Sequence, residues 1–130
     1  QWGWKIRRLL GLGNLSLDLK QHVLRPLMMG IRTLTLSAGI TESHSLERIR
    51  ELEKRGELSA SLSQALQSAY DFIMLLKIRR NFITHENENL SGNEVSLKQL
   101  NPLEQRFLEE SLKVILRLQD EVYARFGGIP

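Results

Sequence analysis

The end of the chain carries the pattern that most restricts the fold, because apolar residues recur there at helical spacing between a start and a stop signal. Asn101 can accept a hydrogen bond from a free N–H of a first turn, Pro102 suits the first helical position, and Glu104 completes a capping box. Gly127 supplies a left-handed stop. A helix is therefore predicted over about 102–126. Its core-facing stripe comprises Leu103, Phe107, Leu112, Ile115, Leu118, Val122 and Phe126.

A second long helix is predicted over about 61–85, starting at the capping-box-like residues SLSQ. One apolar stripe comprises Leu62, Ala65, Leu66, Ala69, Ile73, Leu76 and Ile83. A second stripe, on the far side, comprises Phe72, Leu75, Ile78, Arg79 and Phe82. Because apolar side chains nearly surround the middle of this helix, we expect it to lie at the centre of the fold.

Two shorter helices precede it. One is predicted to begin near Leu24, to tolerate Pro26 in its first turn and to end at Gly39, with Leu24, Leu27, Met28, Ile31 and Leu34 facing inward. The next spans about 44–55 and buries Leu46, Ile49 and Leu52. A short extended piece is expected at 15–19, and residues 86–101 are predicted to form one long loop. The fold class is all-α: an antiparallel bundle of four main helices at about 24–38, 44–55, 61–85 and 102–126, with an N-terminal appendage.

Charge is distributed unevenly along the 130 residues. The net charge of +3 arises in residues 1–40, which hold six Lys and Arg against one acid. No apolar run reaches the length of about 18 residues that a membrane span needs, because Arg25 and Arg32 interrupt the richest one. We therefore expect no membrane partner, and the small net charge gives little support for a nucleic-acid partner. Since the first methionine is Met28, we expect the chain to be part of a longer protein.

Most catalytic and metal-binding signatures are missing from the sequence. The three histidines lie far apart, and no residue pattern matches a zinc helix, a glycine-rich phosphate loop or a nucleophile elbow. Asp18 is followed by Leu19 and Lys20, so an Asp-x-Asp pair that would bind magnesium is not formed. We expect no catalytic residue and no metal ligand in this chain.

A basic cluster on the second long helix is the main candidate binding site. It consists of Lys77, Arg79 and Arg80, and helical spacing places Arg80 within the inner stripe. An unpaired buried charge is costly, so Arg80 should meet an acid, a ligand anion or solvent. Two interpretations stay open for the cluster, a structural ion pair and an anion site. Arg32, on the flank of the first helix, is either a surface charge or a further ligand contact.

The order of four segments resembles a family, the nucleotidyltransferase substrate-binding domain of bacteria. These segments are SLDLKQHVLRPLMMGIRTLTLSAGI, HSLERIRELEKRGELS, ALQSAYDFIMLLKIRRNF and LNPLEQRFLEESLKVILRLQDEVYARF, within about residues 16–126. The resemblance implies a helical bundle, with residues 1–15 as a linker or the remnant of a preceding domain and residues 16–130 as the substrate-binding domain. The family residues fall on Asp18, Lys20, Arg32, Arg48, Lys77 and Arg79. Lys77 replaces an arginine of the family pattern, and lysine cannot make the bidentate contacts of arginine.

The resemblance also implies a larger parent protein. CBS or cyclic-nucleotide-binding modules would precede a catalytic domain similar to PII uridylyltransferases, and that missing domain would hold Mg²⁺ and a nucleoside triphosphate. The expected function is a non-catalytic substrate-binding or regulatory domain of a cytoplasmic signalling nucleotidyltransferase. Its partners would be the preceding domain of the same chain, a protein acceptor substrate and a second copy of the chain. The alternative is a helical dimerisation or docking module without a ligand site.

Overall fold

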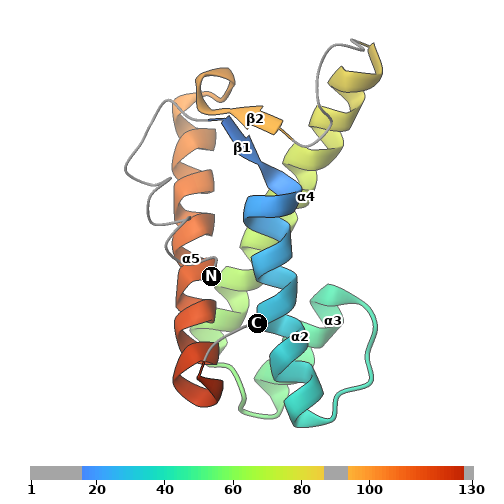
Figure 1. Ribbon diagram of the computed structural model, residues 1–130, viewed down its shortest axis with the longest axis vertical. Coiled ribbons are helices and arrows are strands. Elements are labelled where there is room, and N and C mark those ends of the chain that lie inside the picture. The colour runs from blue at the N-terminus through green and yellow to red at the C-terminus, as the bar shows by residue number, and fades with distance from the viewer. Residues whose placement is uncertain (1–15, 87–93, 128–130) are drawn as a thin grey trace.

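A computed structural model describes residues 16–86 and 94–127 of the chain. In the described part, four α-helices form the body: α2 (Arg25–Ala38), α3 (Ser45–Lys54), α4 (Ala60–Glu86) and α5 (Pro102–Phe126). Helices α4 and α5 run antiparallel along the longest dimension, and α2 runs in the same direction as α5 (Figure 1). Helix α2 packs against α5 and α3, and α3 packs against α4. The predicted all-α class with four main helices is confirmed.

The ends of α2 and α5 follow from local sequence signals. Asn101 Oδ1 accepts the Glu104 N–H at 2.8 Å, and Glu104 Oε1 accepts the Asn101 N–H at 3.0 Å, which completes the predicted capping box. Gly127 ends α5 and Gly39 ends α2, each in the left-handed conformation that glycine adopts without steric cost. These boundaries are confirmed.

The start of α4 differs from the prediction. The helix begins at Ala60, and the Oγ of Ser59 accepts the N–H of Leu62 at 3.1 Å. The capping hydroxyl is therefore Ser59, two residues before the predicted Ser61. Both serines lie ahead of apolar residues at helical spacing, so the local pattern alone did not separate them.

The predicted loop over 86–101 is wrong where the structure describes it. Residues Glu94–Ser96 form strand β2, which pairs antiparallel with β1 (Ser16–Asp18), and Leu97–Gln99 form a 3₁₀ turn, η2. Leu17 and Val95 face each other in this register and are both buried. The expected extended piece near 15–19 is confirmed at 16–18, while residues 87–93 lie outside the described part.

One core joins all the helices. Its largest fully buried side chains are Leu19, Leu27, Ile31, Leu34, Ile49, Leu52, Leu66, Ile73, Leu108, Ile115 and Leu118. Several predicted core positions are instead exposed: Leu75 and Ile78 on α4, and Leu103, Phe107 and Phe126 on α5. Helix α4 is packed by α5, α3 and η1, so its far stripe has no helix over it in the described fold. The expected central position of α4 therefore holds for its inner stripe, whereas the side that carries Leu75 and Ile78 is exposed.

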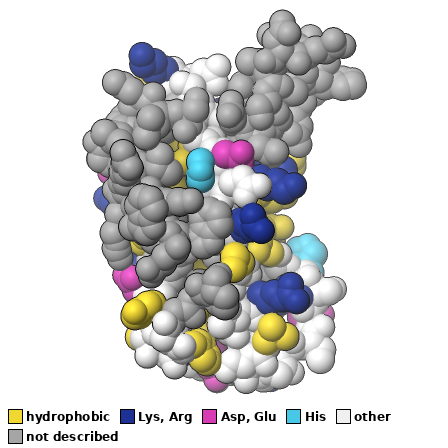
Figure 2. All heavy atoms as spheres, viewed as in Figure 1, with side chains coloured by type: hydrophobic (Ala, Val, Ile, Leu, Met, Phe, Trp, Pro, Cys, Tyr) yellow, Lys and Arg dark blue, Asp and Glu magenta, His cyan; other side chains and the backbone are white. Residues whose placement is uncertain are grey.

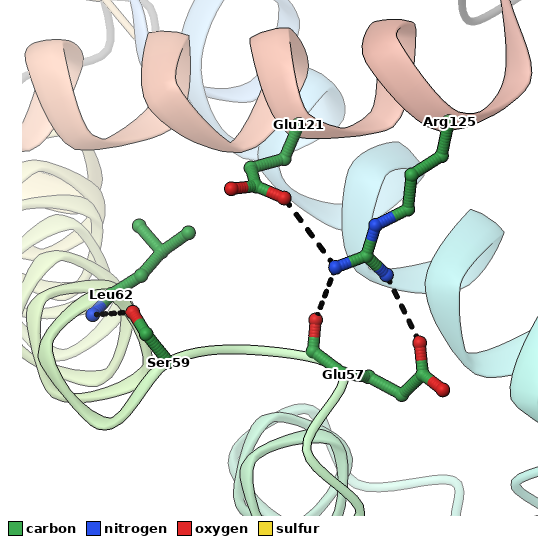
Figure 3. Close-up of polar contacts among 5 residues, drawn as sticks. All are labelled: Glu57, Ser59, Leu62, Glu121 and Arg125. Atoms are coloured by element: carbon green, nitrogen blue, oxygen red, sulfur yellow. Dashed lines mark hydrogen bonds and ion pairs between the residues drawn. The ribbon is translucent and has the colours of Figure 1, made fainter.

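The C-terminal end of α5 is held to the connection between α3 and α4. Arg125 Nη1 lies 3.0 Å from Glu57 Oε2, and Arg125 Nη2 donates to the Glu57 carbonyl at 2.5 Å (Figure 3). Glu121, one turn earlier on α5, lies 3.4 Å from the same guanidinium. One arginine therefore ties two segments that are 68 residues apart in the sequence.

Candidate functional site

Two of the three residues in the predicted α4 cluster are described, and they differ in their surroundings. Arg79 forms an ion pair with Glu104 at the start of α5. Lys77 is half-buried, and no hydrogen bond or ion pair joins its side chain to another described residue. The side chain of Arg80, which was predicted to point inward, lies outside the described part.

Arg79 helps to hold α4 beside α5 through its ion pair with Glu104. The pKa of Glu104 is lowered, first by the hydrogen bond from the Asn101 backbone and second by the hydrogen bond from Arg79. The same carboxylate thus caps α5 and holds α4 beside it. This geometry supports the ion-pair interpretation for Arg79.

Arg48 and Asp18 also contact the protein itself. Arg48 Nε donates to the Glu42 carbonyl at 2.6 Å, which holds the connection between α2 and α3. Asp18 Oδ1 accepts the Gln21 N–H at 3.0 Å, and the Asp18 N–H donates to His22 Nδ1 at 3.2 Å. Asp18 therefore caps the helical turn that follows it, and its carboxylate is oriented along the chain.

That turn is a π-helix, η1 (Leu19–Leu24), which continues directly into α2. Its wide turn is closed by the Arg25 N–H, which donates to the Lys20 carbonyl five residues earlier. Pro26 comes next and has no N–H, so it cannot donate to a carbonyl of the preceding turn, and its ring crowds that turn. This proline gives a physical reason for a wide turn at this place.

A shallow hollow of about 490 Å³ lies over the junction between η1 and α2. It is lined by Lys20, Gln21, Leu24, Arg25 and Met28. Arg25 Nη1 donates to Gln21 Oε1 at 3.0 Å, and this bond orients both side chains at the hollow. Because the amide oxygen of Gln21 is used as an acceptor, its NH₂ group is left to donate. The polar groups of the hollow are thus mainly hydrogen-bond donors.

The charge around this hollow has one sign. Helical residues 19–38 contain Lys20, Arg25 and Arg32 and no Asp or Glu. We call these three exposed residues the η1–α2 basic face; Arg25 and Arg32, seven residues apart, lie on the same side of α2. Figure 2 shows Lys and Arg side chains following one another over the region of η1 and α2. A surface of this kind attracts anions.

Two of the predicted site residues, Lys20 and Arg32, belong to this face, and neither side chain makes a hydrogen bond or ion pair with another described residue. Sequence analysis missed Gln21 and Arg25. The signal that could have found them is the helical run without acids from residue 19 onward, combined with Pro26, which marks the widened turn.

The described residues include no group of three His, Asp or Glu side chains placed to hold a metal ion. None of the described helices combines the length and the apolar character needed to cross a bilayer.

No curated protein and no solved structure matches the chain. A family model does match it, over residues 6–126, and its description is "Putative nucleotidyltransferase substrate binding domain". The match includes all four α-helices, the two strands and the η1–α2 basic face. The chain therefore belongs to this family of nucleotidyltransferase substrate-binding domains.

Proposed function

We propose that the chain recognises a phosphate-bearing substrate for a nucleotidyltransferase domain of the same protein, and that it binds this substrate at the η1–α2 basic face. Family membership supports the role of a substrate-binding domain. The choice of surface rests on the hollow over the η1–α2 junction. This hollow has a volume of about 490 Å³, and Lys20, Gln21 and Arg25 supply its polar lining.

Each polar group in the hollow has a distinct part in this proposal. The Lys20 ammonium supplies a mobile positive charge, and the Arg25 guanidinium supplies planar donors held in place by Gln21. Hydrogen bonds from charged donors to phosphate oxygens are shorter and stronger than neutral ones. Arg32, two turns along α2 from Arg25, extends the positive surface toward a second charged group of the substrate.

In the full mechanism that we propose, the catalytic domain holds Mg²⁺ and the nucleoside triphosphate, while this chain binds and orients. The parent protein would be a cytoplasmic, bacterial signalling enzyme that resembles uridylyl- and adenylyl-transferases, with a protein as its acceptor. Lys77 would add charge from α4, which packs against η1. Arg48 and Asp18 would act indirectly, by holding the α2–α3 connection and the π-turn in place.

Calorimetric titration of the chain with UTP, ATP, pyrophosphate and inorganic phosphate tests the proposal. The Lys20→Gln, Arg25→Gln double variant should weaken binding at least tenfold. A matched control, Lys54→Gln with Arg117→Gln, removes the same charge from exposed sites elsewhere and should change binding far less. Equal weakening in both variants would mean unspecific attraction to net charge and would contradict the proposed site.

The α4 cluster is tested separately by a Lys77→Ala, Arg79→Ala variant. If the cluster binds the substrate, this variant should fold and bind phosphate-bearing ligands more weakly. Because Arg79 pairs with Glu104, lowered stability with unchanged binding would show that the cluster is purely structural. The alternative function, a dimerisation or docking module, draws its support from a different surface, formed by α4 and α5.

A further inference from the structure

Apolar side chains gather on the side of α4 and α5 that no described element covers. Leu75 and Ile78 of α4 are 64% and 62% exposed, and Leu103 and Phe107 of α5 are 60% and 50% exposed. Phe72 of α4 lies beside Phe107, with ring centroids 5.7 Å apart. We call these five residues the α4–α5 apolar surface. Isolated exposed apolar residues are ordinary, but a group of this kind marks an interaction site.

The surface is hollowed next to the two phenylalanines. A depression of about 260 Å³ lies there, and small side chains line it together with the rings: Ala65, Ser68, Ala69 and Ser111. Ser111 uses its hydroxyl to donate to the Phe107 carbonyl at 2.8 Å, so the floor of the depression is mainly apolar. The surface therefore offers both protruding side chains and a space that can receive one.

The residues around Leu75 have a symmetric order on α4. Three positions before and after Leu75 stand Phe72 and Ile78, which are both apolar. Four positions before and after it stand Asp71 and Arg79, which carry opposite charges and are both exposed. Residues three and four apart share one face of a helix, so these five side chains lie on the same side as Leu75.

This order is self-complementary in an antiparallel pair of helices. If α4 of a second copy lies across α4 with a two-fold axis at Leu75, Phe72 of each copy meets Ile78 of the other. Asp71 of each copy then meets the Arg79 that pairs with Glu104 in the other copy, so the contact between Asp71 and Arg79 forms twice. The geometry points to a homodimer, formed by the α4–α5 apolar surface, with Leu75 on the two-fold axis. This inference does not depend on the proposed substrate site, which lies on η1 and α2.

Light scattering coupled to size exclusion tests the dimer, from micromolar to sub-millimolar concentrations. The chain should approach twice its mass of 15.0 kDa as concentration rises. Leu75→Glu should keep it at 15.0 kDa, whereas Leu36→Glu should not. Leu36 is a matched control, because it is 68% exposed and belongs to α2. A wild-type chain that stays monomeric, or a dimeric Leu75→Glu variant, would overturn the proposal and leave the surface to another partner.

Two further experiments locate the axis. The chain has no cysteine, so Leu75→Cys introduces a single thiol that should form an intermolecular disulfide on mild oxidation, whereas Leu36→Cys should not. Asp71→Arg and Arg79→Asp should each weaken the dimer, and mixing the two variants should restore association because opposite charges meet again. Equal crosslinking of both cysteine variants, or no association in the mixture, would contradict an axis at Leu75.

Discussion

Gly30 of α2 and Leu118 of α5 meet so closely that a Cβ at residue 30 would lie 2.7 Å from Leu118 Cδ2. Leu118 is fully buried, so its side chain has little room to move aside. The missing side chain of Gly30 thus sets how closely α2 approaches α5. Since the η1–α2 basic face is carried by the same helix, this contact also fixes the position of the proposed site relative to the bundle.

Replacing Gly30 with alanine should therefore destabilise the chain by about 1–3 kcal/mol through overpacking. In an open helix the same change would be favourable by roughly 0.5–1 kcal/mol. Chemical denaturation measures the difference. In a Leu118→Ala background, where the clash is removed, Gly30→Ala should be neutral or stabilising. Stabilisation by Gly30→Ala alone would contradict the close approach of the two helices.

Replacing the capping residue of α5 should lower the free energy of unfolding less than replacing a core residue of the same helix. Asn101→Ala removes one capping hydrogen bond at an exposed position and should cost about 1 kcal/mol. Ile115→Ala removes a fully buried side chain and should cost about 2–5 kcal/mol, because it leaves a cavity. Urea unfolding of both variants gives the comparison, and similar losses for the two would contradict this packing.

Local signals in the sequence predicted the parts of the fold that depend on neighbouring residues. The Asn101–Glu104 capping box and the stop at Gly127 need only the residues around them, and both are present. Whether a side chain is exposed depends on which elements pack against its helix. Periodicity alone could not show that Phe107 is exposed to solvent while Leu108 is buried in the core. The pairing of β1 with β2 joins segments almost 80 residues apart, so no local pattern encodes it.

In the candidate site, too, the sequence predicted what depends on single residues and their neighbours, and not what depends on how the helices pack. The basic character of Lys20 and Arg32 was visible in the sequence, but the Arg79–Glu104 pair crosses from α4 to α5 and becomes visible only once those helices pack. Arg25 was overlooked because the first helix was predicted to begin near Leu24, so the sequence analysis did not recognise residues 19–24 as a helical turn ahead of it. The π-turn changes which side chains of residues 19–24 line the hollow together with Arg25.

The charge of Glu104 should make stability depend on pH in the acid range. Its pKa lies below the ordinary value of 4.5 in the folded chain, because the Asn101 N–H and Arg79 favour the carboxylate. The stabilisation is therefore complete above pH 4.5 and is lost as the pH falls through the lowered pKa. Comparing unfolding of the wild type and Glu104→Gln across this range isolates the effect. The advantage of the wild type should shrink with acidity, and a constant difference would contradict this assignment.

The Arg125 contacts should contribute modestly to stability. Arg125→Ala removes hydrogen bonds to the Glu57 carboxylate and carbonyl and should cost about 1 kcal/mol, since the guanidinium is partly exposed. Arg117, on the same helix and with no hydrogen bond or ion pair from its side chain to another described residue, is a matched control. Its replacement by alanine should stay within about 0.5 kcal/mol. Equal effects of the two variants in thermal unfolding would show that the Glu57 contacts contribute nothing measurable.

The chain by itself should not transfer a nucleotidyl group. Such transfer needs metal ions that bridge the phosphates, held by carboxylates that converge on them. In the described residues, Asp18 is occupied as the cap of η1. The adjacent acidic pairs Glu109-Glu110 and Asp120-Glu121 lie within α5, so their side chains point about 100° apart. This arrangement is poor for sharing one ion.

Incubation with Mg²⁺, labelled UTP or ATP and candidate acceptor proteins should therefore leave the acceptors unlabelled. The positive control is a protein in which this domain is joined to the proposed catalytic domain, which would supply the metal ligands. Label that survives denaturation in stoichiometric amount, and that disappears when one of the acids in α5 is replaced by its amide, would show that this domain carries chemistry of its own. Binding without labelling is the result expected for a domain that only positions a substrate, because the charged groups that line the proposed site, Lys20 and Arg25, are hydrogen-bond donors to an anion.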